Sequence, residues 1–386
     1  MPINFNETEW RIINAVRAKG KSTRNNIIDI TGLSWGSVSK MTNNLLNENI
    51  IIESKNNEAR DAQYLSVNPD LGYFLGISIG SSFTRMELID FDFQTIGLCD
   101  GNKDESEFSF ETSHSFSELI QDIRRHMKNF IDNRPEAKKL LGVGIAWPGA
   151  VSNNIARYSP TMPYLSELNL NLQELFTPDQ YEFFNEINTI TNKPKSIIID
   201  SYSKCAVAAE YLVGGENYRI RNAKNMACLI IGTGITAGLI LNNQIYGGSN
   251  NYAGQISYFT LEESGKSKND HERQKKIMLG EMMRDYLQNK QAEEIDEELK
   301  RRLGKWVGQS ISYITNLLNP ELVVLTGRFG KTLFTDIYPT LREHVGINTW
   351  HYGLEGLRIE QSKLGRNSAA IGAAIMSYRN QYGSII

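Results

Sequence analysis

The stretch from Ile231 to Tyr258, IGTGITAGLILNNQIYGGSNNYAGQISY, constrains the fold of this chain more than any other. It predicts two strands joined by a glycine turn at 232–234, followed by a hairpin at Asn242-Asn243, because paired asparagines between apolar runs favour a tight turn. A second glycine-rich loop follows at 247–254. Glycines let a backbone approach a ligand closely, which predicts a pocket wall. The same glycines also suit plain turns.

Composition sets broad limits on the class of protein. The 386 residues are enough for two or three domains, and the net charge of −3 leaves room for a small basic face that binds nucleic acid. No apolar run reaches the ~18 residues of a membrane span, and the N-terminus lacks the pattern of a signal peptide. The three cysteines are scattered and the histidines form no ligand-spaced pair. We therefore expect a cytoplasmic protein with no membrane association, no cofactor and no metal site.

The first 67 residues predict a small DNA-binding domain. Residues 7–18 and 23–30 have helical spacing, 31–33 form a turn, and Ser34 is suited to cap a third helix that ends near Asn47. This is the layout of a helix-turn-helix, whose second helix enters the major groove. Two β-rich runs, 50–52 and 64–67, surround a polar tip and predict a wing.

Polar, cationic or aromatic residues before and on the third helix, and on the wing, are the candidates for DNA contact. They are Lys21, Arg24, Ser34, Trp35, Ser37, Ser39, Lys40, Asn43, Lys55 and Arg60. Up to residue 61 the eight basic side chains nearly balance the seven acidic ones, which weakens the electrostatic case for DNA. The cations nevertheless gather where phosphates would lie. The alternative is a small helical domain that binds a protein.

The rest of the chain predicts an α/β fold with a cleft between two lobes. β-rich runs at 73–79, 85–90 and 140–146 alternate with a helical run at 116–131. The second half repeats this alternation, from a strand at 196–199 to a closing helix at 368–378. Two similar α/β halves with a cleft between them are typical of ligand-binding folds.

These segments, taken in order, resemble the ROK family, named for repressors, open reading frames and sugar kinases. The resemblance is to its repressor branch, and it covers nearly the whole chain. The segments that carry it are LGISIGSSFTRMELID (75–90), LGVGIAWPGAVS (141–152), IGTGITAGLILNNQIYGGSNNYAGQIS (231–257), LLNPELVVLTGRFG (317–330) and AAIGAAI (369–375).

The resemblance implies a winged helix-turn-helix followed by a two-lobed actin/hexokinase-like (ribonuclease H-like) sugar-kinase body. We expect the DNA-binding domain at 1–70, the first lobe at 71–195 and the second lobe at 196–365. A C-terminal helix within 366–386 would return to the first lobe.

Departures from the family pattern imply that the body is not a kinase. Family kinases carry an aspartate at the place of Ser78 in the first phosphate motif. Counting back from Glu210 puts Ser201 and Tyr202 at the family's Asn-Asp pair, whose aspartate is the catalytic base. A neutral tyrosine, with a reference pKa near ~10, is a poor base at neutral pH. The family's cysteine-rich zinc loop is replaced by a charged stretch, 262–276.

The altered pocket keeps groups that suit a neutral sugar. Gln255 and Tyr258 stand at the places of the family's sugar-binding glutamate and histidine. Amides, hydroxyls and aromatic rings bind sugars by hydrogen bonding and stacking. The candidate ligand-binding residues are Trp147, Ser201, Tyr202, Gln255 and Tyr258, and the degenerate phosphate loops hold Gly80, Ser81, Gly232, Thr233 and Gly234. Trp147 is also suited to be an ordinary core residue at a strand end.

Two functions of different classes follow. The first is a transcriptional regulator of carbohydrate metabolism, with a sugar or sugar derivative as effector and a double-stranded DNA operator read by a homodimer or a dimer of dimers. The second is a DNA-binding regulator whose sensor has lost its small molecule and responds to a protein partner. A residual sugar kinase is a third alternative.

Overall fold

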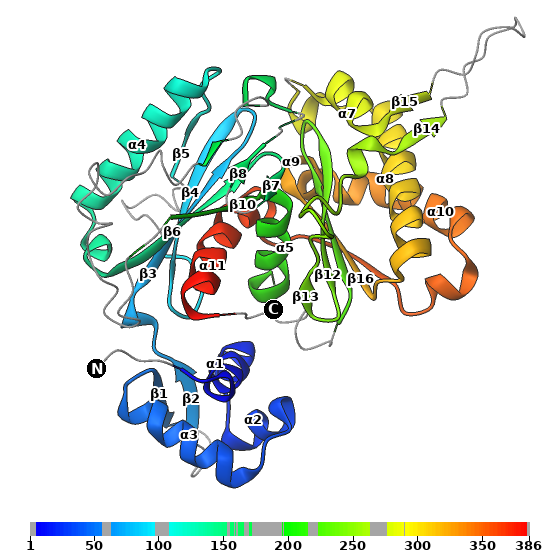
Figure 1. Ribbon diagram of the computed structural model, residues 1–386. Coiled ribbons are helices and arrows are strands. Elements are labelled where there is room, and N and C mark those ends of the chain that lie inside the picture. Colours follow the sequence, from blue (N-terminus) through cyan, green and yellow to red (C-terminus); the bar gives the residue numbers. More distant parts are fainter. Residues whose placement is uncertain are drawn as a thin grey trace, which may run out of the picture.

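A computed structural model describes residues 5–55, 63–96, 108–152, 155–157, 159, 161–165, 170–171, 195, 197–214, 223–262, 276–288 and 290–383. Figure 1 shows a small N-terminal domain attached to a larger body with two lobes. Within the described ranges, no helix combines the length and apolar character needed to cross a membrane.

The N-terminal domain is a winged helix-turn-helix, as predicted. Its helices are capped by side chains at their first turns: Asn6 accepts hydrogen bonds from backbone N–H groups of α1, Thr23 from α2 and Ser34 from α3. The strands β1 and β2 pair antiparallel, and Ser22 bridges to Leu65 beside them. The elements are α1 (Glu7–Lys19), α2 (Arg24–Thr31), α3 (Trp35–Asn47), β1 (Ile51–Lys55) and β2 (Gln63–Val67).

Two five-stranded sheets of identical topology form the body. In each sheet the first three strands are an antiparallel meander, and the last two lie parallel to the first strand. The first has the order β10-β6-β3-β4-β5, from β3 (Tyr73–Ile79), β4 (Phe83–Asp90), β5 (Phe108–Glu111), β6 (Leu140–Trp147) and β10 (Ile197–Ser201). The second has the order β13-β12-β11-β16-β17, from β11 (Met226–Ile231), β12 (Ile235–Leu241), β13 (Gln244–Ile245), β16 (Leu322–Thr326) and β17 (Arg358–Gln361).

The boundary expected at 195/196 needs a correction. β10 lies beyond that boundary, yet it pairs with β6 in the first sheet, with Ile197 opposite Val143 and Ser201 opposite Trp147. A short apolar run such as Ile197–Ile199 suits either sheet, because strand pairing depends on contacts distant in sequence. The second sheet begins only with β11, after helix α5 (Tyr202–Val213).

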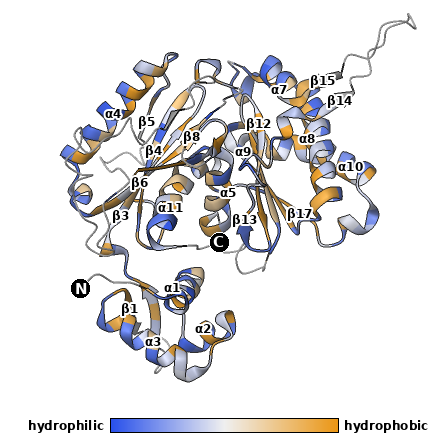
Figure 2. Cartoon of the chain, in the orientation of Figure 1, coloured by the Kyte–Doolittle hydropathy of each residue, from blue (hydrophilic) through white to orange (hydrophobic). Residues whose placement is uncertain are grey.

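Helices cover the outer faces of both sheets and fill the space between them. α4 (Phe116–Asn133) packs on the first sheet, and α8 (Glu297–Leu318) with α10 (Phe334–Asn348) packs on the second. α5 and α11 (Ser368–Tyr382) lie between the sheets (Figure 1). Figure 2 shows central strands that are largely hydrophobic, whereas α4 carries both hydrophobic and hydrophilic residues. Shorter elements are α7 (Leu279–Leu287), α9 (Gly327–Thr332), β7 (Val151–Ser152), β8 (Ile155–Ala156), β9 (Leu170–Asn171), β14 (Thr260–Glu262) and β15 (Lys276–Met278).

The helix α11 touches its neighbours backbone to backbone. A Cβ placed on Gly76 of β3 would lie 1.8 Å from the carbonyl oxygen of Ala370 in α11. A Cβ on Gly372 of α11 would lie 1.7 Å from the carbonyl oxygen of Cys205 in α5. Glycine is required at both places because no side chain fits. The first sheet, α11 and α5 therefore form one tightly packed unit.

Candidate functional site

A cleft of about 410 Å³ opens between the two lobes, within the size range of small-molecule sites. The turn between β3 and β4 forms one wall, and the turn between β11 and β12 lies opposite. Further lining residues come from α5, α7, α9 and the segment 255–258.

The two predicted phosphate loops face each other across this cleft, and all five of their predicted residues line it. The Gly80 amide donates to the Phe83 carbonyl (3.2 Å), and the Gly232 amide donates to the Gly234 carbonyl (2.9 Å), so both loops are tight turns. The hydroxyl oxygens of Ser81 and Thr233 lie 3.0 Å apart, within hydrogen-bonding distance. The two lobes are therefore linked directly at the loops.

Three of the five predicted ligand-binding residues line the cleft: Tyr202, Gln255 and Tyr258. Tyr202 begins α5, while Gln255 and Tyr258 belong to the segment that follows the second glycine loop. That segment is held on β12, because a Cβ on Gly254 would lie 1.9 Å from the Ala237 carbonyl oxygen and its φ is +91°. Tyr258 is 51% exposed.

Trp147 and Ser201 do not line the cleft, and the expectation for them was wrong. Trp147 is wholly buried in the core of the first lobe, and Ser201 is 5% exposed. Side chains alternate between the faces of a strand, so Trp147 shares the face of Val143 and Ile145, which packs under α4. Ser201 shares its face with Ile199 in the same way.

The outer face of α3 presents the residues predicted to read DNA. Trp35 is 61% exposed, and Lys40 and Asn43 are exposed beyond it, while Ser37 and Ser39 are half-buried. Ser34 accepts a hydrogen bond from the Ser37 amide and caps the helix. Lys21 is exposed just before α2. The Lys55 side chain and all of Arg60 lie outside the described residues.

Arg24 differs from the other candidates, because its guanidinium is engaged inside the domain. It donates to the side chains of Thr42 (3.2 Å) and Asn43 (3.1 Å) on α3, and to that of Gln63 (3.3 Å) on β2. It also lies 3.6 Å from the carboxylate of Glu53 on β1. These contacts tie α2 to α3 and the wing, which positions the exposed face of α3.

Comparison with known proteins identifies the family. A sequence model of the ROK family matches residues 75–274, and a winged helix-turn-helix DNA-binding model matches residues 5–52. The chain belongs to the ROK family. It is 22% identical over 375 residues to a xylose repressor of Bacillus spizizenii, covering 91% of this chain and 89% of that protein.

Solved structures share the fold of this ROK protein. A ROK family transcriptional regulator, a homologue of the E. coli MLC protein, superposes with a TM-score of 0.70 at 17% identity, covering 98% of this chain and 97% of that chain. A ROK glucokinase from Streptomyces griseus, in complex with glucose and AMPPNP, has a TM-score of 0.56 at 14% identity. It covers 80% of this chain and 100% of its own. The fifth of the ROK protein that the glucokinase does not cover is close in length to the N-terminal domain.

Carboxylates are scarce in the cleft of this ROK body. Ser78 is buried and does not line the cleft. Asp200 forms an ion pair with Lys204, accepts a hydrogen bond from the Ser201 amide (2.7 Å) and is not among the described residues that line the cleft. Among the described lining residues, Glu281 of α7 is the one carboxylate. The replaced zinc loop falls mostly outside the described residues.

Four cleft arginines were not predicted from the sequence: Arg85, Arg284, Arg328 and Arg366. They lie on separate elements and share no motif, so their spacing along the chain gives no signal that they line one site. Their place in the fold is what brings them to the same cleft.

A buried carboxyl joins the elements behind the cleft. Glu210 of α5 is fully buried and accepts hydrogen bonds from the hydroxyls of Thr326 (2.8 Å) and Ser362. Burial is the main cause that raises the pKa of this carboxyl to about 7. Glu210 thereby connects α5 to the end of β16 and to the segment that leads into α11.

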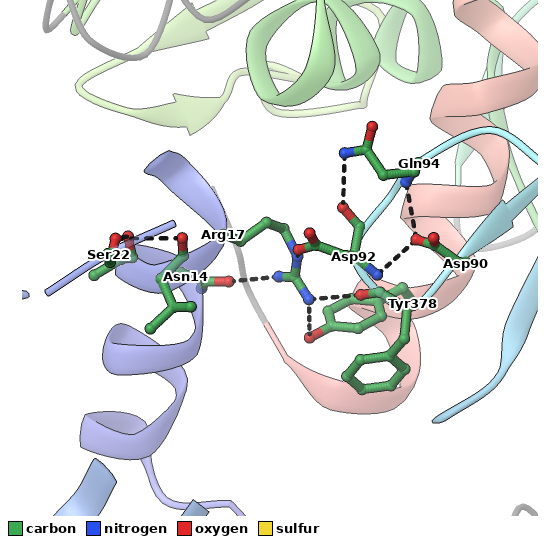
Figure 3. Close-up of polar contacts among 10 residues, drawn as sticks. Asn14, Arg17, Ser22, Asp90, Asp92, Gln94 and Tyr378 are labelled. Atoms are coloured by element: carbon green, nitrogen blue, oxygen red, sulfur yellow. Dashed lines mark hydrogen bonds and ion pairs between the residues drawn. The ribbon is translucent and has the colours of Figure 1, made fainter. Parts of the chain in front are cut away.

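The DNA-binding domain is fastened to the body by Arg17 of α1 (Figure 3). Its guanidinium donates to the Phe91 carbonyl (2.9 Å) and the Tyr378 hydroxyl (3.3 Å), and its Nε lies 3.5 Å from the Asp92 carboxylate. The Phe93 ring lies under the guanidinium, 4.0 Å from its carbon to the ring centre. Arg17 is itself buried at this domain junction.

Proposed function

We propose that this ROK protein is a sequence-specific DNA-binding repressor of carbohydrate metabolism genes, controlled by a sugar or sugar derivative bound in the cleft. The observation that carries this proposal is a winged helix-turn-helix with an exposed reading face on a kinase-like body that lacks carboxylates at the two family positions. The relationship to a xylose repressor supports a carbohydrate-linked role.

Catalysis is not part of the proposal. Loss of a general base typically costs about 10²–10⁴-fold in rate, and phosphoryl transfer also depends on charge neutralisation around the phosphates. Tyr202 stands at the place of the family's catalytic aspartate, and Ser78 at the place of the aspartate in the first phosphate motif. Incubation with ATP and a panel of hexoses should release no ADP above the blank. Sustained turnover would instead establish the residual sugar kinase.

The route from the cleft to DNA runs through α5 and α11. Tyr202 lines the cleft at the start of α5, and α5 packs backbone to backbone on α11. At its other end α11 carries Tyr378, which contacts Arg17 of the DNA-binding domain. A ligand that binds one lobe arrangement more tightly would shift this unit and change the spacing of two reading helices.

A homodimer is needed for a palindromic operator, and the second lobe carries a surface suited to it. Tyr313 and Leu317 share one face of α8, and the Asn316 side chain joins them to the end of α10 and to Trp350 through hydrogen bonds. The exposed apolar side chains there are Tyr313, Leu317, Ile347, Trp350 and Tyr352. Exposed aromatic and aliphatic side chains of this kind suit the core of an interface, which in a stable dimer buries ~800 Å² on each partner.

Sedimentation of Leu317→Glu tests this surface. We expect the variant to sediment as a monomer at concentrations where the parent is a dimer, because a buried unpaired carboxylate is costly. Glu298→Gln, on an exposed part of the same helix, serves as the control. A variant that stays dimeric would place the dimer interface elsewhere.

The regulatory proposal is tested by fluorescence anisotropy on DNA from upstream of the protein's own gene, with a scrambled duplex as control. Salt-sensitive binding that one sugar changes at least tenfold would support a sugar-controlled regulator. Specific binding that no sugar changes would favour the alternative, a regulator controlled by a protein partner.

A further inference from the structure

The buried Glu210 carboxyl lies at a joint between several segments of the chain. Its Oε1 atom accepts hydrogen bonds from the hydroxyls of Thr326, at the end of β16, and of Ser362, just after β17. The Thr326 hydroxyl oxygen also lies 3.0 Å from the Gly365 carbonyl oxygen and 3.3 Å from the hydroxyl oxygen of Ser368, where α11 begins. One carboxyl on α5 therefore holds the ends of two strands of the second sheet and the first turn of α11.

The second oxygen of this carboxyl favours the neutral form. Glu210 Oε2 is buried and has no hydrogen-bond partner among the residues that the structure describes. It faces Gly214, the C-cap of α5, because a Cβ on Gly214 would lie 2.7 Å from it. The carbonyl end of a helix carries partial negative charge, which destabilises a carboxylate beside it. A buried anionic oxygen without a donor is also costly, and a proton on the carboxyl removes both costs.

The groups around Glu210 offset its ionised form only in part. The hydroxyls from β16 and from the segment after β17 favour the ionised carboxylate, and so does the ammonium of Lys331 on α9. That ammonium donates a hydrogen bond to the Lys363 carbonyl (2.7 Å). Burial raises the pKa of the Cys228 thiol on β11, so this neighbour is neutral. Burial outweighs the favourable groups at Glu210, and its carboxyl changes charge near neutral pH.

Each segment at the joint also leads to the cleft or to the DNA-binding domain. Gly327 and Arg328 come directly after β16 and line the cleft. Arg366 lines the cleft just before α11, and Tyr202 lines it at the other end of α5. The far end of α11 contacts α1 of the DNA-binding domain. A change at Glu210 therefore acts on the lining of the cleft and on α11 together.

We propose that Glu210 is a pH-sensitive latch: the neutral carboxyl holds α5, the end of β16 and the start of α11 together, and its ionisation loosens this joint. Opening gives water access to the carboxyl and returns it to its ordinary pKa of 4.5, whereas in the closed joint its pKa is about 7. The closed joint holds the proton more tightly, so rising pH favours opening. Only the effect of the latch on operator binding rests on the proposed function.

Hydrogen exchange of the full-length protein without ligand, followed by mass spectrometry from pH 5 to pH 9, tests the latch. Exchange rates are corrected for the intrinsic effect of pH, so that the protection factors of the same peptides are compared. We expect the protection of peptides from 322–330 and 362–372 to fall about tenfold or more between pH 5 and pH 8. The fall should level off above about pH 7, where the carboxyl of the closed joint is ionised as well.

Two variants separate the latch from a merely structural role. In Glu210→Gln the side chain keeps its volume and does not titrate, so the protection of both peptides should no longer depend on pH. In Ser362→Ala the carboxyl stays but loses one donor to its ionised form, so the pKa of Glu210 rises further. Protection in this variant should continue to fall above pH 7, which keeps the test decisive even where Glu210→Gln does not fold.

Glu298→Gln, at an exposed site on α8, is the matched control and should follow the parent protein. Protection that is independent of pH in the parent, or that falls equally in Glu210→Gln, would overturn the latch. Joint amides as protected as the most protected amides of the protein would overturn it too, because they would exchange only by global unfolding. No sugar or operator enters these measurements, so a confirmed latch in a protein whose DNA binding no sugar changes would refute the sugar-controlled regulator alone.

Discussion

The guanidinium of Arg17 donates a hydrogen bond of 3.3 Å to the hydroxyl of Tyr378, which joins the first helix of the chain to its last. Trp10, about two turns earlier on α1, packs edge-on against the rings of Tyr378 and Tyr382. The DNA-binding domain is thus held to α11 by a buried cation and an aromatic cluster rather than by the linker alone.

Replacement of Arg17 by Met should weaken this junction without removing its aliphatic packing. We expect a loss of about 3 kcal/mol in the free energy of unfolding, because Asp92 loses its buried cationic partner. Operator binding should persist, whereas its response to the effector should fall. Urea denaturation and anisotropy measure the two effects, with Arg301→Met as control. Unchanged stability together with a full effector response would show that the junction carries no coupling.

The raised pKa of the Glu210 carboxyl should make the stability of the protein depend on pH. Its carboxyl has an ordinary pKa of 4.5 and a folded pKa of about 7, so the folded protein holds this proton more tightly than the unfolded chain does. The free energy of unfolding should therefore fall as pH rises from about 4.5 to about 7, by about 3 kcal/mol from this group.

The variant Glu210→Gln should remove that dependence, since an amide keeps the volume and does not titrate. Urea denaturation at several pH values compares it with the exposed Glu298→Gln. Identical pH profiles for Glu210→Gln and the parent protein would exclude Glu210 as the source.

Lys40 and Trp35 should affect DNA binding in different ways. Lys40→Ala should weaken binding to all duplexes alike and reduce the salt slope by about one, as expected for one lost phosphate contact. Trp35→Ala should lower affinity for the operator more than for a scrambled duplex, because the first turn of a reading helix contacts base edges. Anisotropy titrations from low to high salt separate the two patterns, with Arg301→Ala as control. Normal binding by both variants would exclude α3 as the reading helix.

The hydrogen bond between Ser81 and Thr233 should hold the lobes together in the unliganded protein. Thr233→Val keeps the branched shape and removes the hydroxyl. The loss of this hydrogen bond should destabilise the closed arrangement of the lobes by about 1 kcal/mol. Small-angle X-ray scattering should then report a larger radius of gyration, with Thr332→Val, on the surface of α9, as control. An unchanged radius would mean that other contacts set the lobe angle.

Substitution of Gly372 by a larger residue should cause a severe packing defect. In Gly372→Ala the new methyl group would overlap the Cys205 carbonyl, so the contact between α11 and α5 must separate at a cost of about 3 kcal/mol or more. Gly346→Ala is the matched control within helix α10, because nothing lies within 4 Å of its Cβ position. That control should gain up to about 1 kcal/mol. Equal melting temperatures for the two variants would contradict the close packing.

Local patterns in the sequence were enough to predict the winged helix-turn-helix and the glycine turn at 232–234. The cap Ser34 and the pair Asn242-Asn243 act through neighbouring residues, so their signals are complete within a few positions. Asn242 and Asn243 both adopt positive φ, as their hairpin requires. The interpretation of Ser78 and Tyr202 as replacements of family carboxylates likewise rests on contiguous motifs.

The tertiary structure alone decided the rest. It placed β10 in the first sheet, decided between the pocket and the core for Trp147, and buried Arg17 at the domain junction. It also brought four arginines from separate elements to one cleft. Strand pairing, the face a side chain occupies and the convergence of distant charges all depend on contacts between residues far apart in the chain. Such contacts leave no local pattern, whereas turns and helix caps do.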